Sequence, residues 1–280
     1  MKRFLLVILF SCLTIYVVSA QELYVFSEPA STMPANSFGV KYTGKFVEQE
    51  TNGKNLISSR HMFETAFGLS KKLMLHPSVT VSDMYTNSAI RYESMGLYVK
   101  YRFLSIDEVH KHFRAAFYAK GVIGRNDLKY EELTVDGDHT AVQGGLIFTQ
   151  LIHKLAISST IGLTEVLNKE RWLKYDGVRH YSYQNLAYSI SAGYLLLPRQ
   201  YKGFKQTNLN VYCEIMGGAA IDRRAGYFDM APALQLIINS NSKVNLGYRF
   251  QLFGGAYRMA PSGLLVSYER SFLNAFKHKL

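Results

Sequence analysis

Apolar side chains alternate with small or polar ones along most of the chain from residue 37 to the C-terminus. Segment 95–103 shows this clearly: every second residue from Met95 to Phe103 is apolar, and the residues between are Gly96, Tyr98, Lys100 and Arg102. Successive side chains of a β-strand point to opposite faces, so such a strand suits an apolar surrounding on one side and water on the other. Repeated segments of about ten residues with this pattern are typical of a transmembrane β-barrel.

The same alternation predicts about twelve strands. They cover residues 37–47, 58–70, 73–83, 95–103, 112–122, 140–152, 155–165, 184–196, 207–218, 228–238, 243–253 and 262–272. The connections after the second, sixth and tenth strands are short, whereas 124–139 and 166–183 are long. Short periplasmic turns, long outer loops and an even strand number are the rule for bacterial barrels. We therefore predict an all-β fold, a transmembrane antiparallel up-and-down β-barrel of about 12 strands, with a local distortion at Pro77.

A secreted soluble β-sandwich or lipocalin-like barrel also alternates and is the competing fold. A soluble protein would bury its apolar face, and about a dozen strands would then need two domains. No shift of composition marks a boundary between domains in this chain.

The first 20 residues have the features of a secretory signal peptide. Lys2 and Arg3 precede an apolar run of about fifteen residues, and small residues end it at Ala20. Cleavage is expected between Ala20 and Gln21; the alternative, an uncleaved anchor, would need about 20 apolar residues. Residues 21–36 contain two prolines and no alternation, which predicts a periplasmic N-terminal lead-in before a barrel at 37–280. Whether this segment enters the lumen is left open by the sequence.

Composition narrows the class of protein. Removal of Lys2 and Arg3 with the signal peptide lowers the formal net charge from +11 to +9. Nucleic-acid binding is nevertheless excluded, because an export signal precedes basic residues that are spread over strands and loops. The 20 tyrosines and 17 phenylalanines, against one tryptophan, match the aromatic girdles of a membrane barrel. Cys213 is the single cysteine after residue 20, so neither an intramolecular disulfide nor a cysteine-based metal site is expected.

Over essentially its whole mature length the chain resembles the porin-like outer-membrane β-barrel proteins of Gram-negative bacteria. Its opening, Glu22-Leu23-Tyr24-Val25-Phe26 and then 28–35, is similar to the start of uncharacterised barrels of the Bacteroidetes type. The resemblance implies the outer membrane as location, membrane lipid and the barrel-assembly machinery as partners, and transport as function. Such proteins usually end on an aromatic residue, whereas this chain continues beyond Phe276 to Leu280.

Candidate chemistry is sparse. No motif of a barrel phospholipase or protease is present, and no catalytic residue or cofactor is predicted. Asp136, Asp138 and His139 form a short acidic loop, interpreted as a solvated loop tip. Met62, Met74 and His76 point inward on adjacent predicted strands and are weak candidates for a copper site; the alternative is that they simply fill the lumen.

The charged residues predicted to face inward are the most informative group for predicting function. The predicted lumen-lining charged residues are Lys41, Lys45, Glu64, Lys100, Arg102, Arg114, Lys120, Glu214, Asp229, Arg249 and Glu269. Basic residues on the fourth and fifth strands would face acidic ones on the ninth to twelfth across a pore, or would pair with them in a narrow one. The leading hypothesis is porin-like passive passage of small polar solutes, with a mild preference for anions. The alternative is a closed barrel with a structural or surface-binding role through its long outer loops.

Overall fold

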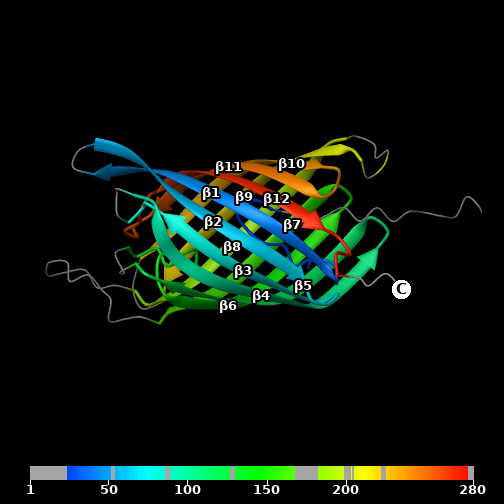
Figure 1. The fold of residues 1–280 in the computed structure, drawn as a ribbon, viewed down its shortest axis with the longest axis horizontal. Coiled ribbons are helices and arrows are strands. Elements are labelled where there is room, and N and C mark those ends of the chain that lie inside the picture. The colour runs from blue at the N-terminus through cyan, green and yellow to red at the C-terminus, as the bar shows by residue number, and fades with distance from the viewer. Residues whose placement is uncertain are drawn as a thin grey trace, which may run out of the picture.

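The computed structural model describes residues 24–51, 54–85, 89–126, 130–167, 182–198, 203, 205–221 and 225–276. These residues form one closed barrel in which each strand pairs antiparallel with its neighbours in sequence and β1 closes onto β12 (Figure 1). The strands are β1 (Ser37–Thr51), β2 (Lys54–Gly68), β3 (Leu73–Ser82), β4 (Arg91–Glu108), β5 (Lys111–Gly124), β6 (Ala141–Ile152), β7 (Leu155–Val166), β8 (Gln184–Leu197), β9 (Thr207–Ala220), β10 (Gly226–Ile238), β11 (Ser242–Gly254) and β12 (Ser262–Phe272). The predicted all-β up-and-down barrel of twelve strands is confirmed.

Two sequence-based expectations fall on other parts of the chain. The signal peptide, with its cleavage site at Ala20 and Gln21, lies outside the described residues, as does most of the predicted loop 166–183. Within the described residues, no helix is both long enough and apolar enough to cross a membrane.

The predicted apolar faces point away from the barrel axis. On β11, for example, Val244 and Leu246 are exposed, whereas Lys243 and Asn245 between them are buried, each 3% exposed. The same inversion, with apolar residues outside and polar residues inside, recurs on β10, where Leu234 and Leu236 flank buried Gln235. A soluble sandwich or lipocalin-like barrel would bury its apolar face, so this distribution contradicts that alternative and suits a barrel surrounded by lipid.

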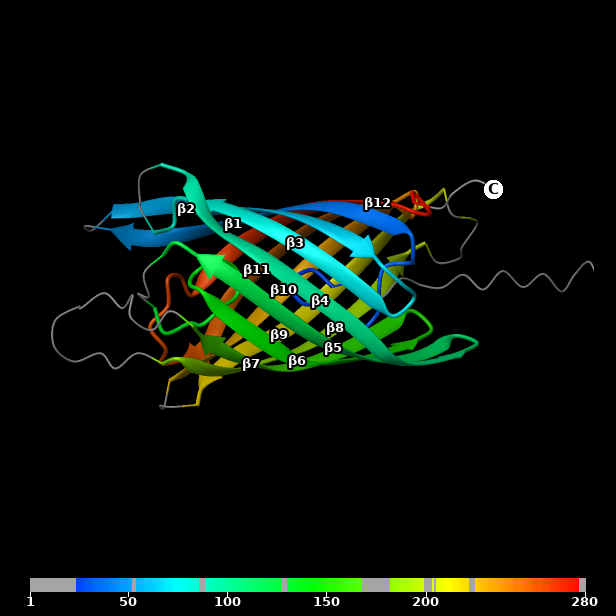
Figure 2. The ribbon, with the colours of Figure 1, turned by 60° about the horizontal axis from the view of Figure 1, so that its bottom comes forward.

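The two ends of the barrel differ. One, the short-turn end, carries the tight connections β2–β3, β4–β5, β6–β7 and β10–β11 together with the start of β1 and the end of β12 (right in Figure 1). The opposite, long-loop end carries the β5–β6 connection, of which residues 125–126 and 130–140 are described, and the β1–β2 hairpin, which projects beyond the other strands (Figure 2).

Several strands are longer than predicted. Pairing of β1 with β2 continues to Thr51 and Lys54, through residues that the sequence analysis assigned to a loop. Pro77 pairs regularly with Leu97 of β4, but the ladder to β2 is interrupted between the pairs Glu64–Ser78 and Phe67–Leu75. This is the expected local distortion without a register shift, because proline has no N–H to donate to the ladder.

Candidate functional site

Residues 24–36, here called the plug segment, lie inside the barrel (dark blue in Figure 2). The buried carboxylate of Glu214 on β9 fixes the tip of this segment by accepting three consecutive backbone amides: those of Val25 at 2.8 Å, Phe26 at 2.9 Å and Ser27 at 2.9 Å. The Ser191 hydroxyl on β8 donates to the same carboxylate at 3.0 Å. Four donors on one carboxylate satisfy a charge that would otherwise be costly to bury.

Further polar contacts follow the plug segment toward β1. The amide of Ala30 donates to Thr149 Oγ1 on β6 at 2.9 Å. Lys100 Nζ on β4 donates to the carbonyl of Pro29 at 2.7 Å and lies 3.3 Å from Glu28 Oε2. Wall side chains thus bind backbone groups of residues 24–36, and these residues lie in the lumen, a point that the sequence left open.

The plug segment leaves the lumen at the short-turn end. There the amide of Asn36 donates to the carbonyl of Gly68 at 3.0 Å, at the end of β2. A side chain at position 68 would come within 2.0 Å of the carbonyl oxygen of Pro34, so only glycine allows this approach.

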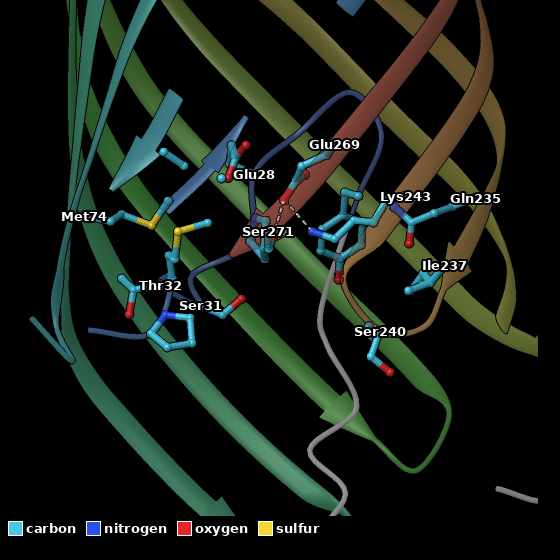
Figure 3. A pocket seen from close by; sticks show the side chains of 18 of the residues that line it. Glu28, Ser31, Thr32, Met74, Gln235, Ile237, Ser240, Lys243, Glu269 and Ser271 are labelled. Atoms are coloured by element: carbon cyan, nitrogen blue, oxygen red, sulfur yellow. Dashed lines mark hydrogen bonds and ion pairs between the residues drawn. The ribbon is translucent and has the colours of Figure 1, made fainter. Parts of the chain in front are cut away.

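A cavity of about 1140 Å³ lies beside the plug segment in the short-turn half of the barrel. Its wall joins basic residues of β1 and β4 to an amide-rich side formed by β9, β10 and β11. Figure 3 shows Gln235 on this side and the paired Lys243 and Glu269 beside it. On that side Gln235 accepts from Asn210 at 3.2 Å and from Tyr212 at 3.0 Å, and it donates to Asn245 at 2.8 Å. The volume fits a small molecule, and the amide and basic side chains of the wall would supply its polar contacts.

Small inward residues do not leave open space in the lumen. A side chain at Gly145 or Gly162 would collide with the ring or hydroxyl of Tyr118, and one at Gly193 would meet the ring of Tyr212. At Gly247 the ring of Phe26, from the plug segment, takes the corresponding space. Tyrosine rings and the plug segment thus occupy the space beside these glycines.

Residues 130–139 of the β5–β6 connection fold into the long-loop half of the barrel and form ion pairs with its wall. Asp136 pairs with Lys45 and, at 3.1 Å, with Lys120. Asp138 pairs with Arg60, which also binds Glu93 at 2.8 Å. The space beside Lys45, Arg60 and Asp136 has no room for a water molecule. The interpretation of this loop as a solvated tip is wrong, since Asp138 and His139 are buried and Asp136 is ion-paired inside the barrel mouth.

A second ion-pair cluster surrounds Glu132. Its carboxylate lies 3.0 Å from Arg249 on β11 and 2.9 Å from Arg258 of the β11–β12 connection. Arg258 also binds Asp229 on β10 at 2.6 Å. Burial opposes the charged form of Glu132, but the charges of Arg249 and Arg258 outweigh it and lower the pKa of Glu132 to about 2.

Two further residues of this loop, Asp136 and His139, have shifted pKa values. Burial also disfavours the charge of Asp136, yet Lys45 and Lys120 hold its pKa well below the ordinary value. Burial lowers the pKa of His139, so this imidazole is neutral at pH 7. At neutral pH Glu132 and Asp136 are therefore ionised beside the basic side chains that bind them.

The eleven predicted charged residues are buried or partly buried, and six of them line the cavity beside the plug segment. They do not form opposed basic and acidic walls, because most find partners nearby. Lys41 lies 3.7 Å from Glu64, and Glu269 lies 2.7 Å from Lys243. At the short-turn rim Arg102 donates to the carbonyl of Lys71, and Arg114 pairs with Asp107 at 3.0 Å.

Functional residues that the sequence analysis missed come mainly from connections. Glu28 in the plug segment and Glu132 and Arg258 in outer connections supply the countercharges of the lumen. The run of acidic residues at 131–138 was a detectable signal, but alternation carries no information on residues outside strands.

The weak copper candidates are not brought together as proposed. Met62 lies opposite Thr80, whereas Met74 lies opposite Gly68, six residues further along β2. At about 3.3 Å per residue the two sulfur-bearing positions are on the order of 20 Å apart. Among the described residues, no group of three or more His, Cys, Asp or Glu side chains could hold a metal ion.

Comparisons with known proteins give the fold. No family model and no curated protein matches the chain. An outer-membrane channel from Pseudomonas putida F1 is similar with a TM-score of 0.58 and 13% identity, over 89% of this chain and 100% of that one. The KdgM porin and the β domain of the Bordetella autotransporter BrkA each give a TM-score of 0.45 at 10% identity, over 84% of this chain and 99% of theirs. The chain therefore shares its barrel fold with an outer-membrane channel.

Proposed function

We propose that the protein is a gated outer-membrane channel for small polar solutes, and that the arrangement described above is its closed state. The observation that carries this proposal is the plug segment itself. A filled narrow barrel is packed by the side chains of its own wall. This lumen instead holds a length of backbone beside a cavity of about 1140 Å³, which supports a path wide enough for small molecules once the segment moves.

The outer-membrane location proposed for this function follows from the predicted export signal and from the apolar outer surface of the barrel. The chain is exported, loses residues 1–20, and is placed in the outer membrane by the barrel-assembly machinery. Its exposed apolar belt contacts lipid there. Passage is passive and needs no catalytic step and no cofactor. Lys41, Lys100, Arg102 and Arg114 line the cavity and support a mild preference for anions.

The test is to remove the anchor of the plug segment without touching the wall. Proline has no backbone N–H, so Val25→Pro with Ser27→Pro deletes two of the three amides that bind Glu214. Val25→Ala with Ser27→Ala is the matched control, because it changes the same side chains and keeps both amides. In planar bilayers the proline variant is expected to carry stable current steps, several-fold larger or more frequent than those of the control. Its reversal potential in a salt gradient reports the preferred ion sign.

The second candidate is a closed barrel that acts through its long outer loops. The ion pairs of residues 130–139 favour it, because they seal part of the long-loop end. A folded, heat-modifiable proline variant that carries no more current than the alanine control would contradict the channel and leave this candidate.

A further inference from the structure

Glu214 is a buried carboxyl group whose hydrogen-bond partners are all neutral. Its residue is 0% exposed, and among the described residues no basic side chain pairs with it. The backbone amides of Val25, Phe26 and Ser27 converge on its two oxygens instead. A primary ammonium group carries three N–H donors and could direct one or two of them to this carboxylate in place of the amides.

Lys100 is a cation covered by the same stretch of chain. It is 1% exposed, and its Nζ contacts the carbonyl of Pro29 at 2.7 Å and the carboxylate of Glu28 at 3.3 Å. The groups that contact Glu214 and Lys100 are thus one to four residues apart along the plug segment. A fully extended chain advances at most about 3.3–3.6 Å per residue, so the two contacts are separated by at most roughly 14 Å; the bends at residues 25–27 and 30 make the separation shorter.

Withdrawal of the plug segment would remove three of the four donors to Glu214 together with the contacts of Lys100 to Pro29 and Glu28. A lumen charge that loses its partners is costly unless a ligand or water replaces them. We propose that the wall beneath the plug segment is a binding site for short zwitterionic peptides, in which Glu214 receives the ammonium group and Lys100 the terminal carboxylate. This inference rests on the proposed function, because only departure of the plug segment exposes the site.

The wall between the two charges suits peptide backbone. Thr149, 0% exposed, accepts the amide of Ala30 at 2.9 Å. Ser191, also 0% exposed, bonds to both the Ser27 hydroxyl and Glu214. These wall side chains bind main-chain groups more than side chains. Peptides of two to four residues with different side chains are therefore expected to bind.

The experiment uses the chain without its signal peptide, carrying Val25→Pro and Ser27→Pro, folded in detergent micelles. Isothermal titration compares trialanine with N-acetyl-trialanine and with trialanine amide. Each cap removes one charge-assisted contact, which is expected to weaken binding by about ten- to a hundredfold. In the added variant Glu214→Gln, N-acetylation is expected to have little further effect; in Lys100→Met the same holds for amidation. This coupling reports direct pairing, since a merely structural role of either residue would weaken all three ligands alike.

Two results would overturn the inference: no saturable binding of trialanine to a heat-modifiable, current-carrying proline variant, or capping penalties that are unchanged in Glu214→Gln and Lys100→Met. Equal binding to the unsubstituted protein also contradicts it, because the plug segment covers the site there. Current without peptide binding leaves the channel intact and rejects only the peptide site. A folded variant with neither current nor binding rejects both proposals.

Discussion

Single residues decide how closely the strands and lumen side chains approach each other. Gly145 on β6 and Gly162 on β7 are directly paired, and Tyr118 of β5 lies opposite Gly145 and over both. A Cβ atom at position 145 would stand 2.2 Å from the carbonyl oxygen of Ile161 and 2.8 Å from Tyr118 Cε1. The backbone of β7 cannot yield as a flexible side chain would, so this glycine is required by packing.

Gly145→Ala is therefore expected to destabilise the barrel by about 1–3 kcal/mol, the usual range for overpacking. The neighbouring Gly144→Ala is the control, since its nearest atom would be Tyr118 O at 3.7 Å, an ordinary contact. Alanine at 144 is expected to be neutral or to stabilise by up to about 1 kcal/mol. Urea unfolding of the refolded protein measures both, and equal stabilities of the two variants would contradict the packing argument.

At the scale of elements, two segments outside the strands determine what the lumen contains. The plug segment is held mainly by hydrogen bonds to its backbone, whereas residues 130–139 are held by ion pairs of their side chains. The first can leave by breaking a few directional contacts near the short-turn end. The second depends on carboxylates staying ionised, which makes the long-loop end sensitive to acid.

The depressed pKa of Glu132 predicts the pH range of that sensitivity. Its pKa is about 2 in the fold and about 4.3 in an unfolded chain, so its ion pairs contribute fully above about pH 4.5 and are lost as pH falls toward 2. Glu132→Gln cannot ionise. The wild-type protein should therefore exceed this variant in unfolding free energy by up to about 3 kcal/mol at pH 7.

The measurement is the difference in unfolding free energy between wild type and Glu132→Gln, in urea, at a series of pH values. The difference is expected to be constant from pH 7 to 5 and to shrink to near zero by pH 2. A difference independent of pH would show that the contribution of Glu132 does not come from its charge.

At the scale of the whole molecule, the apolar belt and the polar lumen together define a barrel turned inside out relative to a soluble protein. Leu246 is 47% exposed in the middle of β11, where it pairs with Leu234 of β10 and Val266 of β12. Exposed leucines at this density would favour aggregation in water but are appropriate in contact with lipid.

The substitution Leu246→Arg tests whether this face of the barrel contacts lipid or water. In lipid bilayers the substitution is expected to cost about 2–4 kcal/mol, and Leu252→Arg, nearer the long-loop end of the same strand, about 0–1 kcal/mol. The measurement is reversible urea unfolding in liposomes. A cost near zero at both positions would mean that this face meets water rather than a membrane.

The strands and their faces could be predicted from the sequence because alternation is a local property. On β11, whether Val244 or Asn245 meets lipid depends on the period of two and on the preference of each side chain for its surroundings. The same argument predicted the inward set of charges. The short and long connections between the strands agreed with an even number of strands. The far part of the β1–β2 hairpin was not predicted by this argument, because its residues pair without regular apolar alternation.

The sequence by itself determined that this chain closes into a twelve-stranded barrel with an apolar outside and a charged inside. Only the tertiary structure decided what fills that inside. Val25 and Glu214 are 189 residues apart, and Glu132 and Arg258 are 126 apart, yet these contacts hold the plug segment and the β5–β6 loop in the lumen. Closure of the barrel places such residues face to face, and the cost of burying a charge then selects partners that no local pattern encodes.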